Sequence, residues 1–265
     1  MTIEPTTGDG LNRVLGLSAA VRFGLSYMIP LTVFTTLGIV NTMTEGHIIS
    51  AYWVTLVAML FTALSYAFMS RSVPRAGSAY AYASHAFGSR IGFLSGWTLL
   101  LDYLLMPTIT YLVIGLYLNA ALPAVPFWVW VVGSIALVTV FTVLGITVVS
   151  GLSSVLLLLQ IAFLLVFAVL TVRSAAGTPL PSLGDTLFGT GPGAGPLFAG
   201  AAILCLSFLG FDAVSTLAEE TVDAKSVIPK AIVLVTLIGG LLFIAISYLC
   251  VIGRSEERRV GKECL

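Results

Sequence analysis

Two carboxylates lie within long apolar runs of this sequence, where an ionised side chain is costly. Asp212 follows a glycine and a phenylalanine in LSFLGFDAVSTLAEE, and Asp102 lies in GWTLLLDYLLMP. An ionisable residue inside a membrane span usually faces a cavity and marks a pathway. An unpaired carboxylate at that depth either protonates or binds a cation. Both acids are therefore candidate ligands for an ammonium group, or carriers of a proton.

Each acid also has a purely structural interpretation. Asp212 can cap the second half of its helix by accepting backbone N–H bonds, which contributes about 1 kcal/mol. Asp102 can be a neutral acid that is hydrogen-bonded to a neighbouring helix. Aromatic faces attract ammonium groups by about 0.5–2 kcal/mol, although each ring can equally serve core packing. The candidate rings are those of Tyr27, Tyr103, Tyr111 and Phe211.

A polar stripe is predicted beyond Asp212. At about 100° per residue, Thr216, Glu219 and Asp223 fall within about 40° of it on a helical wheel. Such a face, with Glu220 beside it, suits a water-filled path toward the cytoplasm. Alternatively, the three acids Glu219, Glu220 and Asp223 merely end the helix at the lipid headgroups.

The elements that carry these residues are predicted to be membrane-spanning helices. The 265 residues are 58% hydrophobic and 9% charged, whereas a soluble domain carries about 25% charged residues. Apolar runs of about twenty residues fit spanning helices, and a lipid-exposed backbone must satisfy its own hydrogen bonds. The sequence therefore predicts an all-α integral membrane protein that carries no basic patch for nucleic acid and no cysteine pattern for a metal site or a disulfide framework.

Seven spans are expected, and basic residues set their orientation. The spans cover about residues 14–40, 51–70, 91–122, 127–149, 153–173, 197–220 and 232–253. With a cytoplasmic N-terminus, seven basic residues face the cytoplasm and only Arg173 faces outward, which satisfies the positive-inside rule. The seven are Arg13, Arg22, Arg71, Arg75, Arg90, Lys225 and Lys230.

The first and sixth spans are both interrupted. Pro30 breaks the first, because proline removes a backbone donor and clashes with the preceding turn, and Gly210 breaks the sixth. Five spans separate the two starts, so the broken helices run in opposite directions. This spacing predicts inverted repeats of five helices with a solute site at the paired breaks. The expected site residues around the breaks are Tyr27, Pro30, Leu31, Thr32, Ser207, Gly210, Phe211 and Asp212, joined by Asp102 and Tyr103.

Several longer strings resemble the amino acid–polyamine–organocation permeases, and among them the bacterial putrescine importers. The strings are SYMIPLTVFTTLGIV, PRAGSAYAYA, GWTLLLDYLLMP, VPFWVWVV and LSFLGFDAVSTLAEETVDAKSVIPKAI. The resemblance implies the first seven helices of a five-plus-five inverted-repeat transporter with helices 1 and 6 broken. It also implies secondary active import of putrescine or a related small amine, coupled to protons or sodium and without a cofactor. An amino acid permease of the same superfamily is the alternative.

Two departures from the family pattern bear on the solute and the coupling ion. Many members have a small glycine-serine-glycine-like break that receives an α-carboxylate, whereas residues 29–32 read IPLT here. This difference favours a diamine. Proton-coupled relatives carry a lysine in the fifth helix, where this chain has Gln160. An intramembrane aspartyl protease is not expected, because LDY and LGFD match neither half of the YD and GxGD signature.

The end of the chain is expected to be foreign. Seven charges fall within residues 254–263, RSEERRVGKE, directly after an apolar helix. The string resembles the translation of a sequencing adapter, and such scars are excluded from fold reasoning. Residues 1–253 are therefore expected to be a truncated transporter domain and residues 254–265 a non-native tail. We expect the 265-residue chain itself to be inactive, because the fold needs ten core helices.

Overall fold

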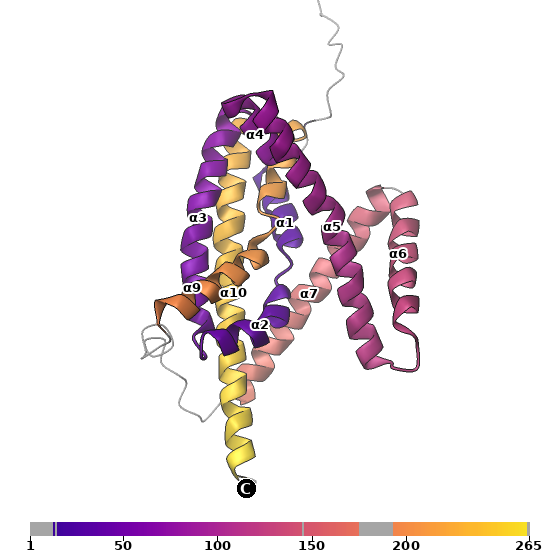
Figure 1. The fold of residues 1–265 in the computed structure, drawn as a ribbon, viewed down its shortest axis with the longest axis vertical. Coiled ribbons are helices and arrows are strands. Elements are labelled where there is room, and N and C mark those ends of the chain that lie inside the picture. Colours follow the sequence, from indigo (N-terminus) through magenta and orange to yellow (C-terminus); the bar gives the residue numbers. More distant parts are fainter. Residues whose placement is uncertain (1–12, 14, 145, 175–192, 264–265) are drawn as a thin grey trace, which may run out of the picture. The chain divides into compact units, whose positions relative to one another are not determined.

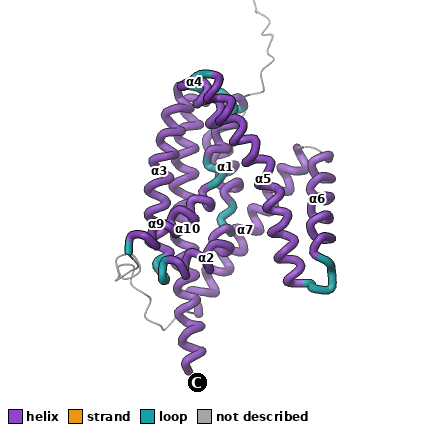
Figure 2. The backbone as a smooth tube through the Cα atoms, in the orientation of Figure 1, coloured by secondary structure: helices purple, strands orange, loops and turns teal. Residues whose placement is uncertain are grey.

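The computed structural model describes residue 13 and residues 15–144, 146–174 and 193–263. The expected cytoplasmic leader and most of the Gly/Pro-rich segment before residue 193 lie outside the described residues. The regular structure of the described part is helical (Figure 2), apart from one isolated bridge between Leu15 and Thr221.

The described helices follow one another along the chain, and Figure 1 shows their arrangement. They are α1 (Leu17–Met28), α2 (Thr32–Met43), α3 (Ile48–Ser72), α4 (Ser78–Phe87), α5 (Ser89–Ala121), α6 (Phe127–Val143), α7 (Ile146–Ser174), α9 (Ala194–Leu204), the 3₁₀ helices η1 (Cys205–Phe208) and η2 (Asp212–Glu219), and α10 (Ala224–Glu263).

The described helices support a multi-pass membrane protein. Five segments are long and apolar enough to cross a membrane, and α1 with α2 makes a sixth that is bent by 51°. The shorter apolar helix α6 is the remaining candidate. It ends at Val143, earlier than the expected limit near residue 149, and α7 begins at Ile146. Between them the sequence has Gly145, a residue type that favours helix ends.

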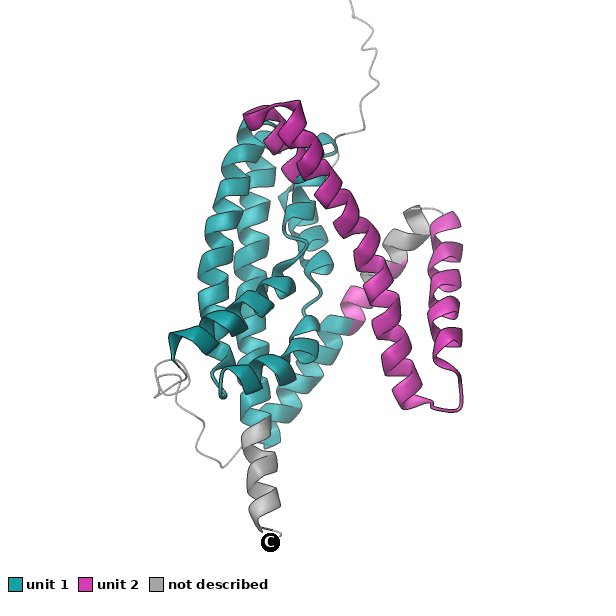
Figure 3. Cartoon of the chain, viewed as in Figure 1, with its two compact units in different colours: residues 1–78, 160–265 teal, residues 79–159 magenta. Residues whose placement is uncertain are grey.

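The chain forms two compact units (Figure 3). The first contains residues 1–78 and 160–265, and the second contains residues 79–159. Both interrupted segments, α1–α2 and α9–η1–η2, belong to the first unit together with α3, α10 and the second half of α7. The second unit consists of α5 and α6, nearly all of α4 and the first half of α7.

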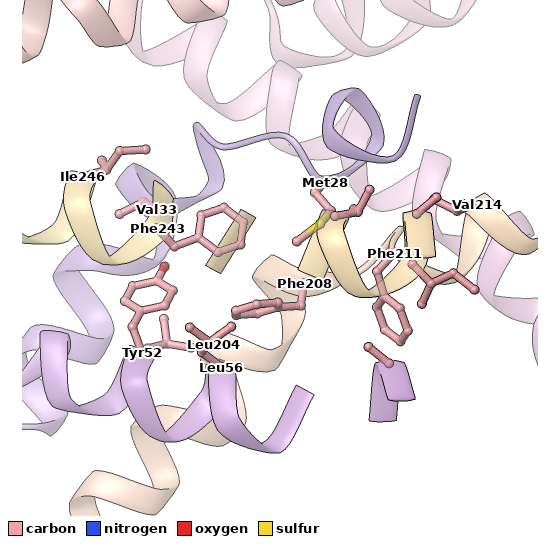
Figure 4. Close-up of a cluster of buried hydrophobic side chains, with 14 of the residues drawn as sticks. Met28, Val33, Tyr52, Leu56, Leu204, Phe208, Phe211, Val214, Phe243 and Ile246 are labelled. Atoms are coloured by element: carbon pink, nitrogen blue, oxygen red, sulfur yellow. The ribbon is translucent and has the colours of Figure 1, made fainter. Parts of the chain in front are cut away.

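The core of the first unit is built around α10, which packs against α3 and α1, while α9 packs against α3 and α2. Figure 4 shows its apolar centre. Tyr52 of α3, Phe208 of η1 and Phe243 of α10 are fully buried. The ring of Phe243 lies 5.8 Å from that of Tyr52 and 5.1 Å from that of Phe208. These rings fix the second interrupted segment between α3 and α10.

In the second unit, small residues allow α4 to approach α5 closely. Gly92 and Gly96 form a GxxxG pattern on α5, a motif that lets helix backbones approach. A β-carbon on Gly92 would overlap Ser84 of α4, and one on Gly96 would lie 2.9 Å from Cδ2 of Tyr80. In this unit the motif therefore serves helix packing.

The last helix, α10, includes most of the segment that is expected to be foreign. Its backbone is helical from Ala224 to Glu263, with Pro229 near its start. The side chains from residue 254 onward lie outside the described part of the chain. The expectation of a non-native tail therefore stays a prediction.

Candidate solute site at two helix breaks

The first break separates α1 from α2 at residues 29–31. Ile29 has a φ of 43°, a left-handed conformation that is strained for a β-branched residue. Pro30 follows and is buried, and a proline donates no backbone hydrogen bond. The chain restarts at Thr32, whose N–H and hydroxyl both donate to the Ile29 carbonyl at 3.0 Å. A strained residue and a proline thus produce the 51° bend.

The second break lies between η1 and η2. Helix α9 ends at Leu204, η1 continues to Phe208, and Leu209 is extended with a ψ of 135°. Gly210 has a φ of 106°, which only glycine adopts without strain. Helix η2 then starts at Asp212, without a side-chain capping bond. Both interruptions expected from Pro30 and Gly210 are therefore present in the structure.

The two breaks contact each other. A β-carbon on Gly210 would lie 2.6 Å from Cδ1 of Tyr27, in the last turn of α1. One turn earlier on α1, a β-carbon on Gly24 would lie 2.6 Å from Cγ2 of Val214 in η2. The absence of side chains at both glycines lets α1 and η2 approach closely.

Backbone hydrogen bonds join the same two elements beyond the start of α1. The N–H of Leu15 donates to the Glu220 carbonyl at 3.0 Å, and the N–H of Val222 donates to the Leu15 carbonyl at 3.0 Å. This bridge is locally parallel and lies outside both helices. Within them, residue 24 contacts residue 214 and residue 27 contacts residue 210. Because one number rises as the other falls, α1 and η2 lie antiparallel.

Asp212 is half-buried and has a hydroxyl partner. Its Oδ2 accepts a hydrogen bond of 3.2 Å from Oγ of Ser78, which lies at the start of α4 but belongs to the first unit. Tyr66 of α3 is close to both side chains. The ring of Tyr66 meets that of Phe211 edge to face at 5.4 Å. The N-cap position of η2 is Phe211, and Asp212 is the first residue of the helix. Asp212 therefore does not serve as the side-chain cap of η2, which the sequence had left as an alternative.

The predicted polar stripe is wrong in its geometry. The stripe assumed 100° per residue, but η2 is a 3₁₀ helix, which advances about 120° per residue. Glu219 accepts a 3.3 Å bond from the backbone N–H of Ala76. The Thr216 hydroxyl donates to the carbonyl of Ala213 at 2.7 Å. Asp223 lies beyond η2 with a φ of 51°, so these side chains do not share one helical face with Asp212.

The remaining candidate residues are distributed over both units. Ser207 is buried, and its Oγ lies 3.4 Å from the hydroxyl of Tyr52. Leu31 and Thr32 are half-buried, whereas Tyr27 is exposed. Asp102 and Tyr103 lie on α5 in the second unit, and both are exposed there. The structure thus brings together the candidates of the two breaks, and it places the second acid on another unit.

Three residues beside the site were not found by sequence reasoning: Tyr52, Tyr66 and Ser78. Nothing in the local pattern of α3 distinguishes these tyrosines from packing residues. Ser78 had a usable signal, since it ends the PRAGS string, and proline and glycine there predict a turn. The residues that the structure describes contain no group of three His, Cys, Asp or Glu that could hold a metal ion.

Comparison with known proteins identifies the family. The sequence model of the amino acid permease family matches residues 20–258. The low-affinity putrescine importer PlaP of Escherichia coli K12 is 42% identical over 90% of this chain and 53% of its own length. The branched-chain amino acid permease BcaP of Bacillus subtilis is 28% identical over 92% of this chain and 56% of its own.

A plant protein extends the comparison. The chloroplastic cationic amino acid transporter 7 of Arabidopsis thaliana is 29% identical over 87% of this chain and 43% of its own length. The chain spans about half the length of the curated relatives it matches. These relatives are transporters, not enzymes. The chain belongs to the amino acid permease family, within the amino acid–polyamine–organocation superfamily.

Proposed function

We propose that the full-length protein is a secondary active transporter that imports putrescine or a related small amine across a bacterial cytoplasmic membrane. The observation that carries the proposal is the contact between the two helix breaks, with Asp212 two residues beyond Gly210. A relative that is 42% identical is named a putrescine importer. Interrupted backbone beside a carboxylate suits a solute that carries ammonium groups.

In this proposal each half-helix end offers free backbone groups, and the acids offer charge. One ammonium group of a diamine binds near Asp212, and Asp102 of the second unit remains a separate candidate ligand for an ammonium group. Aromatic faces from Tyr27, Tyr103 and Phe211 add cation–π attraction of about 0.5–2 kcal/mol. The residues at the breaks complete the site: Pro30, Leu31, Thr32, Ser207 and Gly210.

Transport requires that the site open to each side in turn. Rocking of one helix bundle against a scaffold achieves this in inverted-repeat transporters. The placement of both breaks in one compact unit and the antiparallel contact of α1 with η2 support such a bundle. In the same proposal the N-terminus is cytoplasmic, and protons or sodium drive uptake.

An amino acid permease is the second candidate. The family description and the name of BcaP favour it, because both refer to amino acids. The IPLT sequence at residues 29–32 argues for the diamine, since the first break lacks the small residues that would let an α-carboxylate approach the backbone.

Uptake by the full-length parent distinguishes the two candidates. Cells that lack their own putrescine importers would express the parent, and the uptake of radiolabelled putrescine would be measured with excess unlabelled competitors. We expect putrescine to compete and leucine not to compete. Dominant inhibition by neutral amino acids would instead show that the protein is an amino acid permease. Vesicles with an imposed proton or sodium gradient identify the coupling ion.

The 265-residue chain provides a separate test. It spans 53% of PlaP, and a five-plus-five fold places part of the solute site in the second repeat. We expect this chain to insert into membranes without concentrating the amine. Concentrative uptake by the chain alone would show that seven helices suffice.

A further inference from the structure

The loop between α3 and α4 contacts both ends of η2. The loop and Ser78, the first residue of α4, together read VPRAGS at residues 73–78. Gly77 and Ser78 have φ values of 127° and 47°, so the chain turns sharply here. Ser78 donates to Asp212, the first residue of η2, and the N–H of Ala76 donates to Glu219, the last. The segment is therefore attached at both ends of this half-helix.

The hydroxyl of Ser78 has a defined direction. It is 2% exposed and donates its single proton to the Asp212 carboxylate. A hydroxyl has one donor and two acceptor lone pairs. Ser78 therefore uses its only donor on Asp212.

The backbone at Ser78 is unfavourable for serine. A φ of 47° is uncommon for a residue other than glycine or asparagine. Glycine would be the least strained choice at this position, but it would lack the hydroxyl. A polar side chain kept in a strained conformation, buried and bonded to a candidate ligand, indicates a requirement for the hydroxyl itself.

We propose that Ser78 is a positioning residue that orients the Asp212 carboxylate toward the solute. A carboxylate has about four lone-pair sites, so the bond to Oδ2 leaves others for an ammonium group. Glu219 keeps the loop in place by holding the Ala76 N–H. The inference rests on the proposed function, because it assigns to Asp212 the role of amine ligand.

Ser78→Gly is the decisive variant. It removes the hydroxyl and relieves the strained backbone, so a role in attaching the loop alone predicts an unchanged Kd for putrescine. We expect the Kd for putrescine, measured on purified full-length protein, to rise about tenfold, as for the loss of a hydrogen bond to a charged group. We expect the thermal unfolding midpoint to stay the same or to rise.

Ser70→Ala is the matched control. Ser70 is also 2% exposed, but its hydroxyl donates only to the Ala67 carbonyl of its own helix, at 3.0 Å. Its loss should leave the Kd unchanged. In Asp212→Asn protein, adding Ser78→Gly should weaken binding by much less than tenfold, since the two changes interrupt one interaction.

The outcomes separate the two proposals. If wild-type protein binds putrescine and Ser78→Gly binds it equally well, the positioning role is refuted while the proposed function stands. If wild-type protein does not bind any diamine, the proposed function fails. A fully additive effect of Ser78→Gly in the Asp212→Asn background would also overturn the inference.

Discussion

Gly210 packs directly against Tyr27, and this contact joins the two interrupted helices. A β-carbon on Gly210 would lie 2.6 Å from the ring and 3.2 Å from the backbone carbonyl carbon of Tyr27. The last turn of α1, before the first break, thus packs against the glycine of the second break. The two interrupted segments therefore meet at one place.

The first prediction concerns Gly210→Ala. The added methyl group would collide with Tyr27, and alanine would be strained at a φ of 106°. We expect the full-length parent to lose several degrees of thermal stability and most of its uptake. Gly38→Ala is the control, because nothing lies within 4 Å of its position in α2. Wild-type stability and uptake in Gly210→Ala would refute the close contact.

The antiparallel packing of α1 and η2 can be tested in the 265-residue chain itself. Cysteines at Gly24 and Val214, in a background without the native cysteines, should form a disulfide on mild oxidation, since a β-carbon at residue 24 lies 2.6 Å from Val214. Mobility on a non-reducing gel reports the bond. Cysteines at Gly38 and Val214 serve as the control pair. Equal cross-linking of both pairs would contradict the packing.

The two intramembrane acids should be needed for transport but not for insertion. Asp102→Asn and Asp212→Asn remove charge with little change in shape. We expect each to reduce amine uptake by the full-length parent at least about tenfold, the scale of a charge-assisted interaction. Membrane-fraction immunoblots check insertion. Normal uptake in both variants would remove the acids from the site.

The buried pair of Tyr52 and Ser207 should show a non-additive energy. Tyr52→Phe leaves the Ser207 hydroxyl buried without this partner, at a cost of about 1–3 kcal/mol. Adding Ser207→Ala should recover part of that loss, because both polar groups are then gone. Unfolding midpoints of the four proteins of the double-mutant cycle give the coupling. Strict additivity would show that the 3.4 Å contact contributes nothing.

The breaks could be located from sequence because proline and glycine act locally. Pro30 cannot donate a backbone bond, and Gly210 adopts a conformation that other residues avoid, so both marked real interruptions. The form of the helix after Gly210 could not be predicted the same way. A 3₁₀ helix and an α-helix accept the same residues, and tertiary contacts decide between them.

The partners of the acids depend on contacts between distant residues. Asp212 meets Ser78 across 134 positions and Glu219 meets Ala76 across 143. No helical periodicity relates residues that far apart. The sequence therefore identified Asp212 as a functional candidate but not the hydroxyl that holds it.

Protection of a cysteine at the first break is the most direct test of the central claim, that the solute binds where the two breaks meet. Leu31→Cys would be introduced into cysteine-free full-length protein that still binds putrescine. We predict that saturating putrescine slows labelling of Cys at this position by a small thiol reagent, and that it does not slow labelling of Gly38→Cys. Unchanged labelling at residue 31 under saturating putrescine would contradict the account.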